Sequence, residues 1–311
     1  MIRKIVRHGP STLTVSLPAK WVKKNELKKG DEINISEEGN KITISTEKES
    51  GKKSVEVDVT GLSRSTIMFY IRSLYRQGYD EILVKFKNEK TIYHDTGREI
   101  KVISIIHQEV NRLIGLEVVQ QREDFCALKD LSGVSQDELD SSTKRIFYLL
   151  KDAFNDVVIA IKEKKYSRLE TIEEKHDTIT KFISYCLRIL NKRPQESIKH
   201  ANGMYHALCS LDTTTDMLKY FSRDVRLEKI DFSNESIKLL ESFLKLLSIT
   251  REIFFDKNMN KIKSFMELRS NVKKRITALK SEETKLMYYL TPNIEIMRDL
   301  IETKLSITSP E

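Results

Sequence analysis

The sequence predicts a multidomain α+β protein with three consecutive parts, and three patterns support this division. Residues 1–48 alternate apolar and polar side chains between glycine-containing turns, which is typical of short strands. Residues 55–131 alternate strand patterns with helix patterns, which indicates a small α/β domain. Residues 135–305 repeat apolar side chains at helical spacing without a strong strand pattern, which predicts an all-α bundle of five to seven helices.

The first part reads as strand, turn, strand, short helix and hairpin. The stretch TLTVSLP alternates strictly, and Pro18 ends this strand and suits the first turn of a helix over about residues 18–26. We expect Trp21 and Val22 to face inward and the lysines of this helix to face outward. A turn at Gly30–Asp31 then leads into two strands joined by EEGN. So short a segment cannot bury a sufficient core alone, so it is expected to dimerise or to pack on a neighbour.

The middle part begins after a polar and charged linker at residues 45–54. Strands are predicted at SVEVDVTG, DEILVKF, LEVVQQ and FCALKDL, with helices at RSTIMFYIRSLYRQ and GREIKVISIIHQEVNRL. The part contains no glycine-rich phosphate loop and no nucleophile elbow. Its expected role is that of a spacer or a dimerisation unit.

Charge is segregated within the first part. Residues 1–30 contain eight Lys or Arg and one acid, Glu26, whereas residues 31–50 contain six acids and two lysines. The basic residues could be a solvated surface that serves solubility. Dimerisation would, however, join them into a continuous basic strip that matches the phosphate spacing of a duplex, which favours contact with nucleic acid.

The overall composition is that of a folded protein with 311 residues and a formal net charge of +8, which permits an anionic partner without requiring one. The three cysteines are scattered, and no apolar run has the length of a signal peptide or a membrane span. We therefore expect a soluble cytoplasmic protein. No serine or cysteine nucleophile accompanies a base motif, so the sequence predicts no enzyme and no catalytic residue.

Acidic residues recur four positions apart on the predicted helices. The pairs are Glu173 and Asp177 in EEKHD, Asp212 and Asp216 in LDTTTD, and Glu295 and Asp299 in EIMRD. Residues at this spacing share one helix face, and two such faces across a bundle can bind a metal ion through carboxylates. Such pairs are also common on solvated faces of Lys/Glu-rich helices, so both interpretations stay open.

A weak internal repeat accompanies these pairs. An offset of 94 residues sets the region around LETIEEKHDTI against the region around FMELRSNVKKRI, which places Glu173 on Glu267 and Asp177 on Asn271. The pattern predicts a helical domain built from two related three-helix halves.

Residues 1–46 resemble the AbrB/SpoVT/MazE family of DNA-binding domains. The markers are a turn at Gly9 followed by Ser11, a strand that runs into LPAKW, and KKGDEI before the last hairpin, and their order is closest to the MazE-like branch. The resemblance implies a homodimer that forms an interleaved, swapped-hairpin β-barrel. It also implies that basic residues contact double-stranded DNA, namely Arg3, Lys4, Arg7, Lys20, Lys23 and Lys24. Pro10–Ser11 departs from AbrB-type members, which have an arginine after the glycine.

The helical part resembles PhoU, a fold of two three-helix repeats that binds metal ions through acidic motifs. LDTTTD stands where that family shows LERIGD, and Asn271 replaces an acid of the second repeat. The resemblance implies a divalent or iron-type metal ion at one site and a weaker second site. The first site would use Glu173, Asp177, Asp212 and Asp216, and the second would use Glu295 and Asp299.

Together, the two resemblances match the architecture of archaeal-type PhoU-related phosphate uptake regulators. They imply a dimeric DNA-binding transcriptional regulator, linked to phosphate or metal homeostasis, whose helical domain senses a signal or binds a partner. A first alternative is a PhoU-like adaptor that binds a phosphate transporter or a sensor protein without binding DNA. A second alternative is an antitoxin-like protein, although such proteins usually carry a disordered tail where this sequence predicts a folded bundle.

Overall fold

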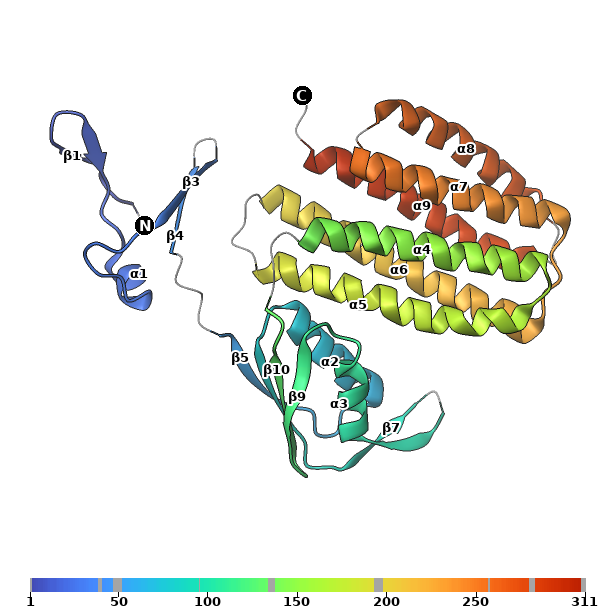
Figure 1. Ribbon diagram of the computed structural model, residues 1–311, viewed down its shortest axis with the longest axis horizontal. Coiled ribbons are helices and arrows are strands. Elements are labelled where there is room, and N and C mark those ends of the chain that lie inside the picture. Colours follow the sequence, from blue (N-terminus) through green and yellow to red (C-terminus); the bar gives the residue numbers. More distant parts are fainter. Residues whose placement is uncertain are drawn as a thin grey trace. The chain divides into compact units, whose positions relative to one another are not determined.

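A computed structural model describes most of the chain, and it separates into two compact units, Met1–Lys53 and Ser54–Glu311 (Figure 1). The described residues are 2–38, 41–46, 52–94, 96–133, 138–192, 198–256, 258–279 and 283–308. The first unit contains short strands and one helix. The second contains an α/β part (residues 54–133) and a helical part (residues 138–308).

The first unit consists of two antiparallel hairpins with a one- to two-turn helix between them. Its elements are β1 (Val6–His8), β2 (Thr12–Thr14), α1 (Ala19–Lys24), β3 (Asn34–Glu38) and β4 (Lys41–Ser45). The two hairpins form separate two-stranded sheets. The strand predicted by TLTVSLP is shorter than its alternation suggests, because pairing with β1 ends at Thr14. The predicted EEGN turn includes residues 39–40, which lie outside the described residues.

The described residues of this unit form no apolar core. No residue of the unit whose exposure the structure describes is buried, and Trp21 and Val22 are only half-buried. Leu13 on the first hairpin is 68% exposed and Ile42 on the second is 62% exposed. Several large apolar side chains exposed on one small unit are typical of a surface that a partner covers.

The α/β part is a four-stranded sheet with two helices packed against it. Its main elements are β5 (Ser54–Asp58), α2 (Arg64–Arg76), β6 (Glu81–Lys85), α3 (Val102–Val110), β9 (Leu116–Gln121) and β10 (Phe125–Asp130). The strand order is β5-β6-β10-β9, with β5 and β6 parallel and the other pairs antiparallel. Helix α2 makes the crossover between the parallel strands, and the Ser63 hydroxyl accepts the Thr66 N–H at its start. These elements agree with the strands and the first helix that the sequence predicts.

The second helix of this part is shorter than predicted. The sequence pattern predicts that residues 97–101 begin it, but β7 (Lys90–Tyr93) and β8 (Arg98–Lys101) form a hairpin, and α3 starts only at Val102. Gly97 has φ +67°, a left-handed conformation that makes the hairpin turn and cannot continue a right-handed helix. The apolar periodicity of the segment continues smoothly across this boundary, so periodicity alone does not reveal the hairpin.

The helical part is all-α, as predicted. Its α-helices within the described residues are α4 (Glu138–Lys162), α5 (Thr171–Lys192), α6 (Ile198–Glu228), α7 (Asn234–Asp256), α8 (Met259–Thr277) and α9 (Thr284–Ile307). A 3-10 turn, Tyr166–Glu170, precedes α5. Aromatic side chains join the helices in a continuous core, and Phe154 of α4 stacks on Phe243 of α7 with ring centroids 4.6 Å apart.

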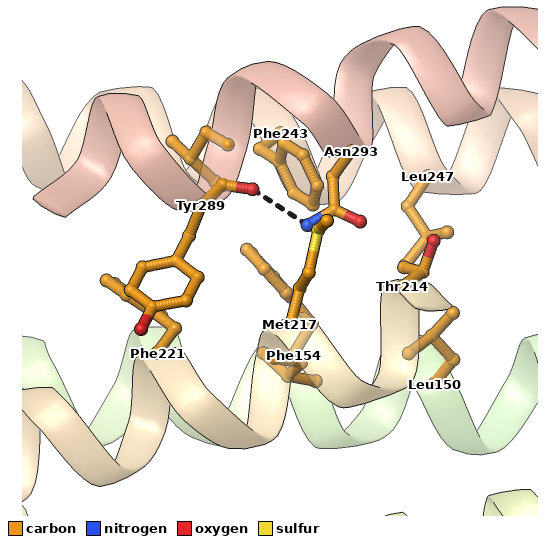
Figure 2. Close-up of a pocket in the computed structure, with 11 residues that line it drawn as sticks. Leu150, Phe154, Thr214, Met217, Phe221, Phe243, Leu247, Tyr289 and Asn293 are labelled. Atoms are coloured by element: carbon orange, nitrogen blue, oxygen red, sulfur yellow. Dashed lines mark hydrogen bonds between the residues drawn. The ribbon is translucent and has the colours of Figure 1, made fainter. Parts of the chain in front are cut away.

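Pro292 lies inside α9, although the sequence predicts a helix break there. Proline removes one backbone donor from the helix, and the neighbouring Asn293 Nδ2 donates to the Tyr289 carbonyl at 2.8 Å. Figure 2 shows Asn293 at the wall of an apolar pocket between α4, α6, α7 and α9. This pocket has a free volume of about 10 Å³, enough for about one water molecule, so it does not admit a larger ligand in this conformation. The other predicted break, at Pro194, lies outside the described residues.

Candidate nucleic-acid interface and the acidic helix face

The basic residues predicted to contact DNA are all exposed or half-exposed side chains of the first unit. Arg3 and Lys4 precede β1, Arg7 lies within it, and Lys20, Lys23 and Lys24 lie on α1. Arg3 Nη1 donates to Ser16 Oγ at 3.2 Å, and Arg7 Nη2 donates to the Pro10 carbonyl at 2.6 Å. Both bonds hold the guanidinium groups near the first hairpin without neutralising them.

None of these six side chains forms an ion pair with the residues that the structure describes. Helix α1 also ends with Lys23 and Lys24 in its last turn and has no acid in its first turn. Unpaired surface cations of this kind are available to phosphate oxygens, which they bind with release of counterions.

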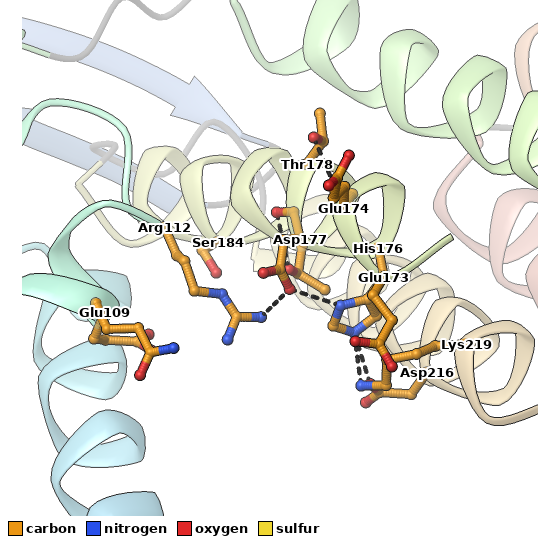
Figure 3. A network of polar contacts seen from close by, with 12 residues as sticks. Glu109, Arg112, Glu173, Glu174, His176, Asp177, Thr178, Ser184, Asp216 and Lys219 are labelled. Atoms are coloured by element: carbon orange, nitrogen blue, oxygen red, sulfur yellow. Dashed lines mark hydrogen bonds and ion pairs between the residues drawn. The ribbon is translucent and has the colours of Figure 1, made fainter. Parts of the chain in front are cut away.

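Four acids predicted as metal ligands lie on α5 and α6, which pack together. We call Glu173, Asp177, Asp212 and Asp216 the acidic face. His176, which is 6% exposed, connects the two helices: its Nδ1 lies 2.9 Å from Asp177 Oδ1 and its Nε2 lies 2.8 Å from Asp216 Oδ1 (Figure 3). The structure therefore brings together acids that are far apart in the sequence.

Each carboxylate of the acidic face contacts a cation of the same chain. The four contacts are Glu173 to Arg223 Nη2 at 2.7 Å, Asp177 to Arg112 Nη2 at 2.7 Å, Asp212 to Arg76 Nη2 at 3.1 Å, and Asp216 to Lys219 Nζ at 2.7 Å. Two of these cations belong to α6 itself. The other two, Arg76 and Arg112, come from the α/β part.

The pKa values of the central groups follow from these contacts. Burial alone would raise the pKa of Asp216, but hydrogen bonds from His176 and Lys219 outweigh it and hold that pKa at about 2. Burial alone would lower the pKa of His176, but its hydrogen bonds to Asp177 and Asp216 outweigh burial and raise that pKa above its ordinary value. The network thus favours charged acids and a charged imidazole.

The acidic face, paired in this way, does not fit a metal site. A divalent cation needs several oxygen or nitrogen ligands that converge with free lone pairs and an excess of negative charge. Within the described part of the chain, no group of three or more His, Cys, Asp or Glu side chains is arranged to hold a metal ion. Metal binding by these residues stays a prediction of the sequence.

The two acids of the weaker predicted site on α9 are also paired with basic side chains of the same chain. Arg269 Nη2 and Lys273 Nζ, both from α8, donate to Glu295 at 2.6 and 2.8 Å, and Arg298 pairs with Asp299 at 2.7 Å. The bonds from Lys273 and Arg269 lower the pKa of Glu295, although burial opposes them. Asn271, which aligns with an acid of the first half, is exposed.

Sequence reasoning missed the arginines that hold these carboxylates and one further arginine, Arg188. The Arg188 side chain is 1% exposed; its Nη2 donates to Asp80 at 3.0 Å and Asp130 at 2.7 Å, and its Nη1 donates to the Tyr75 and Tyr79 carbonyls. A signal was available, because Arg188 stands within the apolar run YCLRIL, and arginine is rarely buried without a partner. The partners themselves lie more than 50 residues away.

One family match covers most of the first unit. Residues 6–53 match the family model described as antidote-toxin recognition MazE, bacterial antitoxin. No curated protein and no solved structure matches the chain. The first unit therefore contains a MazE/AbrB-like domain, as the sequence predicts. No helix among the described residues is both long and apolar enough to cross a membrane.

Proposed function

We propose that the chain is a DNA-binding transcriptional regulator that dimerises through its first unit. One observation carries the proposal: the unit that contains the MazE-like domain displays six accessible Lys and Arg side chains that have no ion-pair partner among the described residues. Side chains of this kind contact phosphates and position a protein on a duplex, with base readout added by neighbouring groups. In the second unit, by contrast, many arginines are neutralised by acids.

Dimerisation is supported by the exposed apolar side chains of the same unit. Leu13 and Ile42 lie on separate hairpins, and the described residues of the unit form no core that covers either side chain. A second copy that interleaves its hairpins would bury both surfaces in a shared barrel. The same arrangement doubles the basic surface.

Duplex binding over a salt series tests this proposal. The full chain is expected to bind with an affinity that falls steeply with salt, and Arg3→Ala/Lys4→Ala/Arg7→Ala is expected to reduce the salt slope by about one for each phosphate that the variant no longer neutralises. The matched control is Lys151→Ala/Lys263→Ala/Lys274→Ala, which removes the same charge from surface positions of the second unit. Equal binding by both triple variants would contradict the proposal.

For the helical part we propose a sensing or partner-binding role linked to phosphate or metal homeostasis. This assignment rests on its resemblance to PhoU, and a phosphate transporter or signalling protein would be the partner. If the chain is instead an adaptor that does not bind DNA, the salt series shows no duplex binding.

The family description favours a second candidate, an antitoxin-like regulator. Such a protein would also bind DNA, so the salt series does not separate the two functions. They differ in whether residues beyond 53 bind a protein toxin. Growth of cells that express a candidate toxin, with and without this chain, distinguishes them.

A further inference from the structure

We infer that the acidic face of α5 and α6 is a binding site for arginine side chains of the α/β part, and that these arginines occupy the place of a metal ion. The inference concerns the second unit only, and it does not depend on the proposed DNA-binding function.

The first argument is geometric. Arg76, at the end of α2, reaches Asp212 at 3.1 Å, and its Nη2 and Nε also donate to Ser184 Oγ at 3.1 and 3.2 Å. Arg112, just after α3, reaches Asp177 at 2.7 Å. Both arginine side chains are about four-fifths buried, and Asp212 is buried to a similar extent, whereas the Asp177 side chain is half exposed at the edge of the interface.

The second argument is that α5 presents one continuous polar stripe to the α/β part. The stripe contains Asp177, Lys181, Ser184, Arg188 and Asn191, spaced alternately by four and three residues as one helix face requires. Every member contacts the α/β part: Lys181 Nζ donates to the Asn111 carbonyl at 3.1 Å, and Asn191 Nδ2 donates to the Arg76 carbonyl at 2.7 Å. An acid of the predicted metal site is thus the first position of a docking stripe.

The third argument is electrostatic. The four carboxylates of the acidic face are matched by four cations, which leaves no excess negative charge to attract a divalent ion. Arg72 also lies near these acids, but it is paired with Glu109, whose side chain is fully buried, so this pair adds no net charge. A metal ion at the acidic face would therefore have to displace Arg76 and Arg112 and leave two largely buried guanidinium groups without their carboxylate partners, a costly exchange.

Manganese binding to the full chain tests the inference. Isothermal titration with Mn²⁺ is expected to show no stoichiometric site in the natural chain. Arg76→Ala/Arg112→Ala frees two carboxylates and is expected to gain Mn²⁺ affinity by at least tenfold. The matched control is Arg226→Ala/Arg275→Ala, because these arginines pair with Glu170 and Glu235 within the helical part; it is expected to bind no Mn²⁺.

Hydrogen exchange supplies a second readout that needs no metal. Asp177→Asn/Asp212→Asn releases the arginines while it keeps side-chain size, and the amides of α2 and α3 are expected to exchange several-fold faster than in the natural chain. Those of α7 and α8 should not change. Tight Mn²⁺ binding by the natural chain that is abolished in the Asn variant would overturn the inference, as would unchanged exchange in α2 and α3.

Discussion

The two units of this chain use the same residue types in opposite ways. In the first unit, lysines and arginines such as Arg3 and Arg7 are exposed and unpaired within the described residues, and large apolar side chains such as Leu13 face outward. In the second unit, Arg76, Arg112 and Arg188 bind acids of a neighbouring element, and the apolar side chains fill two cores.

The difference follows from chain length and from what each surface must contact. A segment of about 50 residues cannot bury enough apolar area to fold on its own, so its surface remains suited to external partners. The second unit is large enough to use arginines for internal contacts. Composition alone therefore does not predict the role of a basic residue, because that role depends on the groups that the residue contacts.

The largest effect is expected from Arg188→Met. This change leaves Asp130, whose side chain is 3% exposed, as a buried charge without its guanidinium partner. We expect a loss of about 3–5 kcal/mol in the free energy of unfolding of the second unit, measured by urea denaturation. Arg168→Met removes an exposed pair with Glu163 and is expected to cost less than about 1 kcal/mol. Similar costs for the two variants would refute the internal role of Arg188.

Leu13→Asp/Ile42→Asp addresses the first unit. Two charges placed in a shared apolar interface are expected to weaken dimerisation about 100-fold or more, because each buried carboxylate would lack a partner. Sedimentation equilibrium should show a dimer for the natural chain and a monomer for the variant. The urea midpoint of the second unit should not move, and a variant that stays dimeric would show that other residues form the interface.

Gly203→Ala tests how tightly the second unit packs. A Cβ at this position would overlap Ile307 Cγ2, so α6 and α9 must separate or Ile307 must move. We expect a loss of about 1–2 kcal/mol in thermal or urea unfolding. In an Ile307→Ala background the same change should be neutral or stabilising, because alanine has the higher helix propensity. If Gly203→Ala costs the same free energy of unfolding in both backgrounds, the predicted overlap with Ile307 is ruled out.

The smallest effect is expected from Lys144→Ala. Lys144 pairs with Asp140 four residues away on α4, and both side chains are more than half exposed. Solvent screening should limit the loss to about 0.3–0.5 kcal/mol, measured by urea denaturation beside Arg188→Met. A cost above about 1 kcal/mol would show that the exposed Lys144–Asp140 pair and the buried Arg188–Asp130 pair do not differ in stability because of burial.

Local patterns predicted the elements of this fold well, and long-range contacts much less. Helix α2 and strand β9 agree with their predicted ranges within a residue, because their periodicity and turn residues are local. The β7–β8 hairpin was missed because the apolar periodicity of α3 continues into Arg98–Lys101, although the partner strand Lys90–Tyr93 lies close by in the sequence.

The predicted metal-binding acids show the same difference between local patterns and long-range contacts. The spacing of Glu173 and Asp177 correctly placed both residues on one helix, and the fold brings them near Asp212 and Asp216. Their partners could not be inferred, because Arg76 and Arg112 lie 65 or more positions away along the chain. Residue spacing predicts which groups share a face, but only the tertiary fold decides what that face binds.

Arg188 also bears on how this chain could have been assembled from modules. The four hydrogen bonds of Arg188 run to residues of the α/β part. A helical bundle inherited without that part would therefore carry the Arg188 charge on its surface without these partners. The first unit is a compact unit of its own and could be exchanged for another small domain. Gene fusions that replace the first unit and keep residues 54–308 together should thus fold, whereas fusions that split the chain near residue 133 should not.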